Sequence, residues 1–398
     1  MNNKSAIVYF IVVALDSISY GLIAPILAPL LTSHNGFFFS NHSEIYQYWL
    51  YGIFIGLFPL TYMIAAPILG LLSDRYGRKK LLLICLLITL TTFICYAFAF
   101  TYKLIGLLLF ARVLAGLSAG SQGVAQAAVA DFADQKNKPH MISIIAIGMT
   151  LGLIIGPLVA SVWSSQFSWL PFIIVILFCL FSLYLLWQLP ESPIKTLKLF
   201  SINEIKNIIK IPKVLKLLSV FLLFELGWSL YLQSLPLYLN LAFHLQTQQI
   251  GFATTYIGTL LALFLLIGTR FSLKYINSRL LSVSQFGLFL GLFSFLMSAI
   301  NLQLSLFLIF AIYVVFSVAV IYPCIISQLS HWVPQEKQGL LMGITDGIIA
   351  LAFTITGFLS SLFIYINLNL IFCFAALCWV IAIGLLWRRS LHLAISYT

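Results

Sequence analysis

Four ionisable residues lie deep inside long apolar segments of the 398-residue sequence: Asp16, Arg112, Glu225 and Asp346. A charged side chain at the centre of a membrane costs about 2.5–3.5 kcal/mol on insertion scales, so such groups are kept for proton relays, ion pairs or substrate contacts. A carboxyl group held away from water could take up and release a proton near neutral pH. We therefore expect Asp16 and Glu225 to exchange protons. Asp346 could equally serve the inner mouth or a helix contact.

The segment around Arg112 carries glycines and two glutamines at helical spacing, and small residues of this kind let helices pack closely. We expect the arginine to face a cavity or a carboxylate, the alternative being a purely structural ion pair, for example with Asp16. After Glu225, an aromatic and polar set is able to line a substrate pocket. The residues predicted for proton coupling and the substrate cavity are Asp16, Tyr20, Arg112, Gln122, Gln126, Glu225, Trp228, Tyr231, Gln233 and Asp346.

The composition requires a membrane around these residues. Apolar residues make up 62% of the chain and charged residues 8%, and the mean hydropathy is +1.08, all outside the range of soluble proteins. A span needs roughly 20 apolar residues, so the chain has room for about twelve. We expect an all-α membrane protein with spans at 6–32, 48–73, 80–101, 103–131, 140–163, 169–189, 215–242, 250–272, 280–300, 304–331, 339–364 and 370–388.

The basic residues indicate which way the chain crosses the membrane. With the N-terminus in the cytoplasm, every lysine and arginine except Lys103 and Arg112 falls on the cytoplasmic side. This explains the net charge of +11 better than nucleic-acid binding does. We expect a multi-pass protein of a bacterial inner membrane with both termini cytoplasmic, acting as a monomer. The six cysteines lie in apolar runs without CxxC spacing, which favours packing over disulfides or a metal site.

The chain divides into two halves around a charged loop. We expect six-helix bundles at 1–189 and 215–398, joined by a cytoplasmic linker at 190–214. A weak internal repeat supports this division, since SDRYGRKKL at 73–81 lines up with SLKYINSRL at 272–280, at the same place in each half. The linker contains either a short amphipathic helix on the membrane surface or a flexible segment.

The loop sequence GLLSDRYGRKK combines glycines, an aspartate and a basic cluster. It resembles the loop motif G-x-L-x-D-R-x-G-R-K of the major facilitator superfamily. The resemblance implies a fold of two pseudo-symmetric six-helix bundles and a charge network that latches the cytoplasmic side. Ordinary positive-inside anchoring would explain the basic residues, but not the aspartate and both glycines, of which Gly70 is expected to allow close helix approach. The latch residues are Gly70, Asp74, Arg75, Gly77, Arg78, Lys79 and Asp131.

Three further segments resemble the drug and proton antiporters of that superfamily. The arginine of ARVLAGLSAGSQG matches their second motif, in which it is linked to proton transfer, and ALDSISYGLIAPILAPLL is similar to the first helix of tetracycline efflux proteins. The fifth span carries glycines four residues apart, on one helix face, followed by a proline. This run resembles the motif of exporters, although a plain packing seam is the competing interpretation. Its residues are Gly148, Gly152, Gly156 and Pro157.

These features together predict a secondary active transporter that exports a small amphiphilic solute or drug in exchange for protons, by alternating access. It needs no cofactor beyond the proton gradient. The alternative is uptake or export of a specific metabolite such as a siderophore, amino acid or nucleoside. The third span has Cys95 where tetracycline exporters carry an acid, and the ninth has none, which counts against tetracycline itself. A membrane enzyme has no support from sequence motifs.

Overall fold

The computed structural model describes residues 3–32, 44–132, 138–163, 167–190, 202–274, 280–300, 303–334 and 337–395, and the regular elements among them are helices. In chain order these are α1 (Asn3–Thr32), α2 (Glu44–Tyr76), α3 (Arg78–Tyr102), α4 (Ile105–Ala119), α5 (Ser121–Phe132), α6 (Lys138–Ala160), α7 (Leu170–Trp187), α8 (Ile202–Ile209), α9 (Pro212–Phe243), α10 (Thr247–Lys274), α11 (Leu280–Ile300), α12 (Leu304–His331), α13 (Gln338–Ile366) and α14 (Leu370–Ile395).

Eleven helical segments in the described part of the chain are long and apolar enough to cross a membrane, and α6 adds a shorter apolar stretch, Ile147–Ala160. Helices α4 and α5 form one such segment, Ile105–Val129, interrupted at Gly120. The predicted twelve spans and the all-α membrane fold are confirmed. Helices satisfy every backbone group internally, which a chain surrounded by lipid requires.

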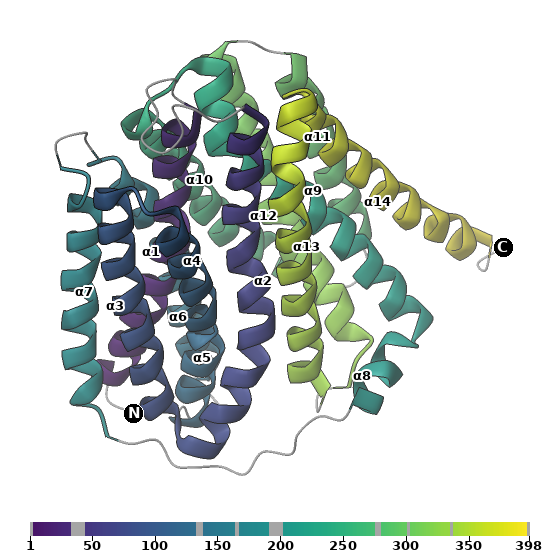
Figure 1. Cartoon of the computed structure of the whole chain (residues 1–398). Coiled ribbons are helices and arrows are strands. Elements are labelled where there is room, and N and C mark those ends of the chain that lie inside the picture. Colours follow the sequence, from purple (N-terminus) through teal and green to yellow (C-terminus); the bar gives the residue numbers. More distant parts are fainter. Residues whose placement is uncertain are drawn as a thin grey trace. The chain divides into compact units, whose positions relative to one another are not determined.

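Unit 1 is one of two compact units in the chain and comprises residues 1–198 together with 239–258. Within it, α1 packs against α6, α5 and α7, while α3 packs against α4 and α7, and α2 against α4 (Figure 1). The domain boundaries expected from the sequence, 1–189 and 215–398 with a linker at 190–214, stay a prediction.

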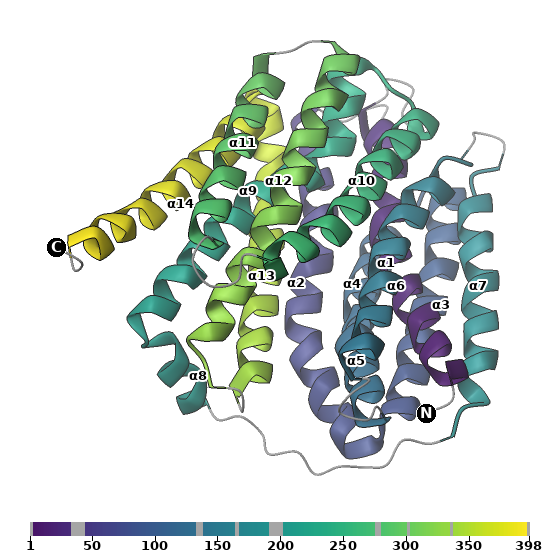
Figure 2. The ribbon, with the colours of Figure 1, turned by 180° about the vertical axis from the view of Figure 1, so that it is seen from behind.

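Unit 2 comprises residues 199–238 and 259–398. Its helix α11 packs against α12 and α14, and α13 packs against α14, α12 and the short helix α8 (Figure 2). A buried tryptophan, Trp379 on α14, lies in its core and donates from its indole nitrogen to the carbonyl oxygen of Phe224 on α9 at 3.1 Å. Glycines allow this ring to fit, because a Cβ at Gly291 would lie 1.8 Å from it.

A glycine turn joins α2 to α3 in unit 1. Gly77 has φ 96° and ψ 142°, a conformation that is open to glycine and strained for other residues. Its amide donates to the carbonyl of Ser73 at 3.1 Å, and its own carbonyl accepts from the amide of Leu81 at 3.3 Å. The turn therefore brings the end of α2 directly to the basic residues that begin α3.

Replacing Gly77 with alanine should lower the free energy of unfolding by about 1–3 kcal/mol, because the added Cβ meets no neighbour and only the backbone strain is measured. Gly70→Ala is the matched control. Its Cβ also meets nothing, but Gly70 is helical, so alanine should be neutral or stabilising there. The measurement is the Tm of the purified full chain in detergent. Equal Tm values for the two variants would contradict this account of the turn.

Candidate functional site

The carboxyl group of Asp16 is buried in unit 1 and is held by hydroxyl groups. Asp16 is 3% exposed, and its Oδ2 accepts a hydrogen bond from the hydroxyl of Ser121, the first residue of α5. The hydroxyl of Thr89 on α3 lies 3.3 Å from Oδ1 and 3.0 Å from the carbonyl oxygen of Cys85. Three helices, α1, α3 and α5, thus converge on one carboxyl group.

Beside this carboxyl group, Gln122 donates to the hydroxyl of Ser17 at 3.3 Å, which links α5 to α1 a second time. Gln126 and Tyr20 are half-buried. Of the residues predicted for the cavity, Asp16 and Gln122 are therefore brought to the same α1–α5 contact.

Arg112 on α4 is fully buried, and its surroundings are aromatic. Its Nε donates to the carbonyl oxygen of Phe54 on α2 at 2.9 Å. The guanidinium carbon lies 4.9 Å from the ring centroid of Phe58 and 5.9 Å from that of Tyr20. The ion pair with Asp16, which the sequence left open, is not formed in this structure, because Asp16 is bonded to Ser121 and Thr89 instead.

The glycine run of α6 lies directly against the backbone of α1. A Cβ at Gly148 would lie 2.8 Å from the carbonyl oxygen of Phe10, and one at Gly156 2.8 Å from that of Ile18. At Gly152 the corresponding distance is 2.3 Å, to the carbonyl oxygen of Ala14, with the Cβ of Ser17 at 2.5 Å. Since these α1 residues flank Asp16, the glycine face sets the position of the helix that carries the carboxyl group.

Pro157 completes the seam between α1 and α6. A Cβ at Gly21 of α1 would lie 2.9 Å from the proline Cδ and 3.4 Å from the carbonyl oxygen of Leu153. A proline at this position cannot donate to that carbonyl, which is freed from the usual helical hydrogen bond. Further along, a Cβ at Gly251 of α10 would lie 2.6 Å from the carbonyl oxygen of Pro157, so α6 has close neighbours in both α1 and the start of α10.

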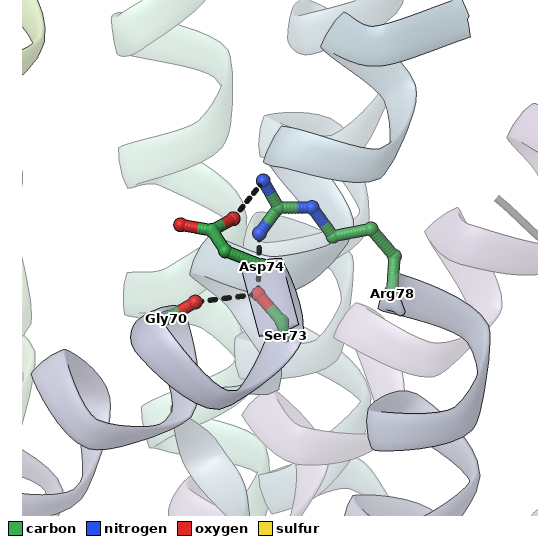
Figure 3. A network of polar contacts seen from close by, with 4 residues as sticks. All are labelled: Gly70, Ser73, Asp74 and Arg78. Atoms are coloured by element: carbon green, nitrogen blue, oxygen red, sulfur yellow. Dashed lines mark hydrogen bonds and ion pairs between the residues drawn. The ribbon is translucent and has the colours of Figure 1, made fainter. Parts of the chain in front are cut away.

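Asp74 and Arg78, both predicted for the latch, meet at the α2–α3 turn (Figure 3). Arg78 is buried and forms an ion pair with Asp74, while its second amino group donates to the hydroxyl of Ser73. That hydroxyl lies 2.7 Å from the carbonyl oxygen of Gly70. The close helix approach expected at Gly70 is absent among the described residues, because no atom lies within 4 Å of a Cβ built there.

Two other latch residues behave differently from the pair. Arg75 is exposed and lies over the ring of Tyr76 at 5.4 Å. Asp131 is in the last turn of α5, and its side chain is outside the described part of the structure. Its place in the latch stays a prediction.

Lys79 binds the end of α7, which the sequence did not predict. Its Nζ donates to the carbonyl oxygen of Trp187 at 2.8 Å and to that of Leu189. The last carbonyls of a helix have no partner within the helix, and a lysine there satisfies them and interacts favourably with the helix dipole. The α2–α3 turn is thus fastened to the point where the chain leaves the first six spans.

Unit 2 holds the two other acidic residues predicted to lie within spans, Glu225 and Asp346. Glu225 on α9 is 3% exposed, and among the described residues no hydrogen bond or ion pair reaches its carboxyl group. Asp346 on α13 is exposed. Tyr322 on α12 lies near both carboxyl groups.

The predicted aromatic pocket residues are packed inside unit 2 in this structure. Trp228 stacks on Tyr231 at 6.1 Å, and the Tyr231 ring also meets that of Phe295 at 5.6 Å. Gln233 donates to the hydroxyl of Thr356 on α13 at 2.8 Å. All three predicted residues are at least nine-tenths buried, so a role in lining a substrate pocket stays a prediction.

The sequence did not reveal the hydroxyl groups that form hydrogen bonds with the charged residues: Ser121 and Thr89 with Asp16, and Ser73 with Arg78. Hydroxyls in apolar spans are common and mostly bond to their own helix, so composition does not single these three out. Among the side chains that the structure describes, no three His, Cys, Asp or Glu residues come together as a metal site would require.

Comparison with protein families shows which family the chain matches. Residues 9–316, and in a second overlapping match residues 217–393, fit the model described as Major Facilitator Superfamily. The class H tetracycline resistance protein of Pasteurella multocida is 34% identical over 171 residues, and the class C protein of Escherichia coli 31% over 158 residues. These matches cover 43% and 39% of the chain and 40% and 37% of the relatives, so the chain spans about two-fifths of the curated relatives it matches.

Solved structures share the fold at low identity. The human organic anion transporter superposes with a TM-score of 0.71 at 19% identity, covering 96% of this chain and 99% of that one. The D-xylose-proton symporter gives a TM-score of 0.76 at 17% identity, covering 96% and 97%. At this level of identity the likeness concerns the fold alone.

Replacing Gly152 with alanine should push α1 away from α6, because the new Cβ would overlap the Ala14 carbonyl oxygen and the Ser17 Cβ. Overpacking of this kind costs about 1–3 kcal/mol, which we expect as a lower Tm of the detergent-purified chain. Gly123→Ala on α5 is the matched control, since its Cβ meets no atom within 4 Å. A Gly152→Ala protein as stable as the control would disprove the proposed close contact.

Proposed function

Because the chain belongs to the major facilitator superfamily, and is therefore a multi-pass membrane transporter and not an enzyme, we propose that it is a proton-coupled antiporter that exports a small amphiphilic solute. The proton gradient is its energy source, and no cofactor takes part. We further propose that it acts as a monomer in a bacterial inner membrane, with both termini in the cytoplasm; the distribution of its basic residues supports this orientation.

The buried carboxyl group of Asp16 is the observation that carries this proposal. As a carboxylate it accepts hydrogen bonds from Ser121 and Thr89. After protonation its own O–H can donate to one of these oxygens, while Thr89 turns its single hydrogen to the Cys85 carbonyl, 3.0 Å away. Both protonation states therefore find hydrogen-bond partners without a change of fold, which is what a group that loads and releases a proton in every cycle needs.

The solute and the proton are coupled through alternating access. In this scheme the two six-helix bundles rock around a shared cavity, and the ion pair of Arg78 with Asp74, together with Asp131, holds the cytoplasmic side closed. Protons loaded from outside on Asp16 or Glu225 are exchanged for solute inside. Gln122 and the glycine face of α6 would then act by placing α1, which carries the carboxyl group.

Export is favoured by the relatives, since several proteins similar to this chain are named tetracycline resistance proteins. A second candidate is proton-coupled transport of a specific metabolite, because a D-xylose-proton symporter has the same fold. The two differ in the phenotype of a deletion strain. Export predicts greater susceptibility to toxic compounds, whereas metabolite uptake predicts poor growth on a single nutrient.

Asp16→Asn should reduce proton-driven solute flux at least tenfold, because an amide of the same shape cannot exchange a proton. The chain is reconstituted in proteoliposomes that contain a pH-sensitive dye, with solutes chosen from drugs, siderophores and nutrients that raise its Tm. Glu204→Gln, an acid-to-amide change on α8, is the control and should keep wild-type flux. Unchanged proton-driven flux in Asp16→Asn would show that Asp16 is not the coupling site.

Glu225→Gln tests whether unit 2 contributes a second proton. If both carboxyl groups are loaded in each cycle, the variant should transport fewer protons per solute molecule while still responding to a pH gradient through Asp16. The ratio is obtained from parallel measurements of proton and solute flux in the same vesicles. A ratio identical to that of the wild-type protein would leave Asp16 as the single coupling group and exclude Glu225.

A further inference from the structure

The positive charge of Arg112 has no carboxylate partner among the described residues. The side chain is 0% exposed. An arginine remains protonated in proteins, so its charge cannot be removed by releasing a proton. A buried charge without a counter-charge costs several kcal/mol. Among the described residues, Arg112 therefore lacks a negatively charged partner that would offset the cost of burying its charge.

The geometry shows which part of the guanidinium is free to bind such a group. Nε is taken by the carbonyl oxygen of Phe54, and one face lies over the ring of Phe58. The two terminal amino groups are buried and make no hydrogen bond of normal geometry. The hydroxyl of Tyr96 lies near the guanidinium, but a phenol brings no negative charge. The edge formed by the two amino groups remains, and it matches the two oxygens of a carboxylate.

An aromatic cluster lies beside the guanidinium, with the ring of Phe58 over one of its faces. Phe58 packs with Tyr20 at 5.2 Å between ring centroids, and Tyr62 joins the same cluster. Both tyrosines are half-buried, unlike the guanidinium behind them. A flat apolar group could stack here while its charged end meets Arg112. Asp16 does not serve as the counter-charge of Arg112, because its oxygens accept hydrogen bonds from Ser121 and Thr89.

We propose that Arg112 binds the carboxylate of a small aromatic anion and that such anions are the solute class of this transporter. The inference rests on the proposed function and narrows it from amphiphilic solutes in general to negatively charged ones. The guanidinium supplies the charge and a two-point contact, and Tyr20, Phe58 and Tyr62 supply the surface for the ring. Neutral or cationic compounds of the same shape would leave the buried charge without a counter-charge and bind less well.

The test compares benzoate with benzamide, which have the same ring and nearly the same shape but differ in charge. Thermal unfolding of the detergent-purified full chain is followed with each probe, at constant sodium concentration and with chloride as the reference anion. Saturating benzoate should raise the Tm of the wild-type protein by about 2–4 °C, and benzamide should not. Arg112→Gln should abolish the shift, while Lys206→Gln, which removes an exposed positive charge on α8, should retain it.

A second pair of variants keeps the test decisive if Arg112→Gln does not fold. Arg112→Lys retains the charge but loses the two-point contact and should weaken benzoate binding at least fivefold. Tyr62→Leu removes a ring from the cluster and should also weaken it. Equal shifts with benzoate and benzamide, a benzoate shift that survives in Arg112→Gln, an unchanged benzoate affinity in Arg112→Lys, or the same shift with chloride alone would overturn the proposal.

These measurements need no proton gradient, so their failure is distinct from a failure of the proposed antiport. No benzoate binding together with proton-driven flux that depends on Asp16 would reject the anion site alone. Benzoate binding with flux that ignores the pH gradient would support the site and reject proton coupling.

Discussion

The close approach of α1 and α6 is the contact on which the candidate site depends. Three glycines of α6 leave no room for a side chain against the α1 backbone, from Phe10 to Ile18, and Pro157 meets Gly21 further along. In a membrane no hydrophobic force drives helices together, so backbones this close are held by packing. The position of α1 in turn decides whether the Asp16 carboxyl group can meet α3 and α5 together.

The buried hydroxyl groups of the described spans differ in what they bind. Most serine and threonine side chains in the described spans bond to a carbonyl of their own helix, as Thr92 does with Ile88 and Ser182 with Phe178. Ser121 departs from this pattern by donating across helices to a carboxylate. Arg112 is the opposite case, since its neighbours are aromatic rings and neutral oxygens. Asp16 thus accepts hydrogen bonds from other helices, whereas Arg112 has no carboxylate partner among the described residues. This difference in partners distinguishes the candidate site from ordinary packing.

The sequence predicted the spans well because a span is decided by local composition: α11 and α12 begin and end at the predicted residues. It also predicted the glycine face, because a four-residue period fixes a helix side. It could not predict which side chains meet across helices. Ser121, Thr89 and Ser73 are ordinary residues whose roles depend on tertiary packing, and Gly70, expected at a close helix contact, meets no described atom.

The hydrogen bonds from Lys79 to the end of α7 join two segments that are far apart in the chain. Lys79 follows Arg78 directly, so the turn that holds the ion pair with Asp74 also holds the carbonyls of Trp187 and Leu189. Hydrogen bonds to charged groups contribute about 1.5–3 kcal/mol each. Displacing the end of α7 would therefore break hydrogen bonds at the α2–α3 turn, one residue away from the Arg78–Asp74 ion pair.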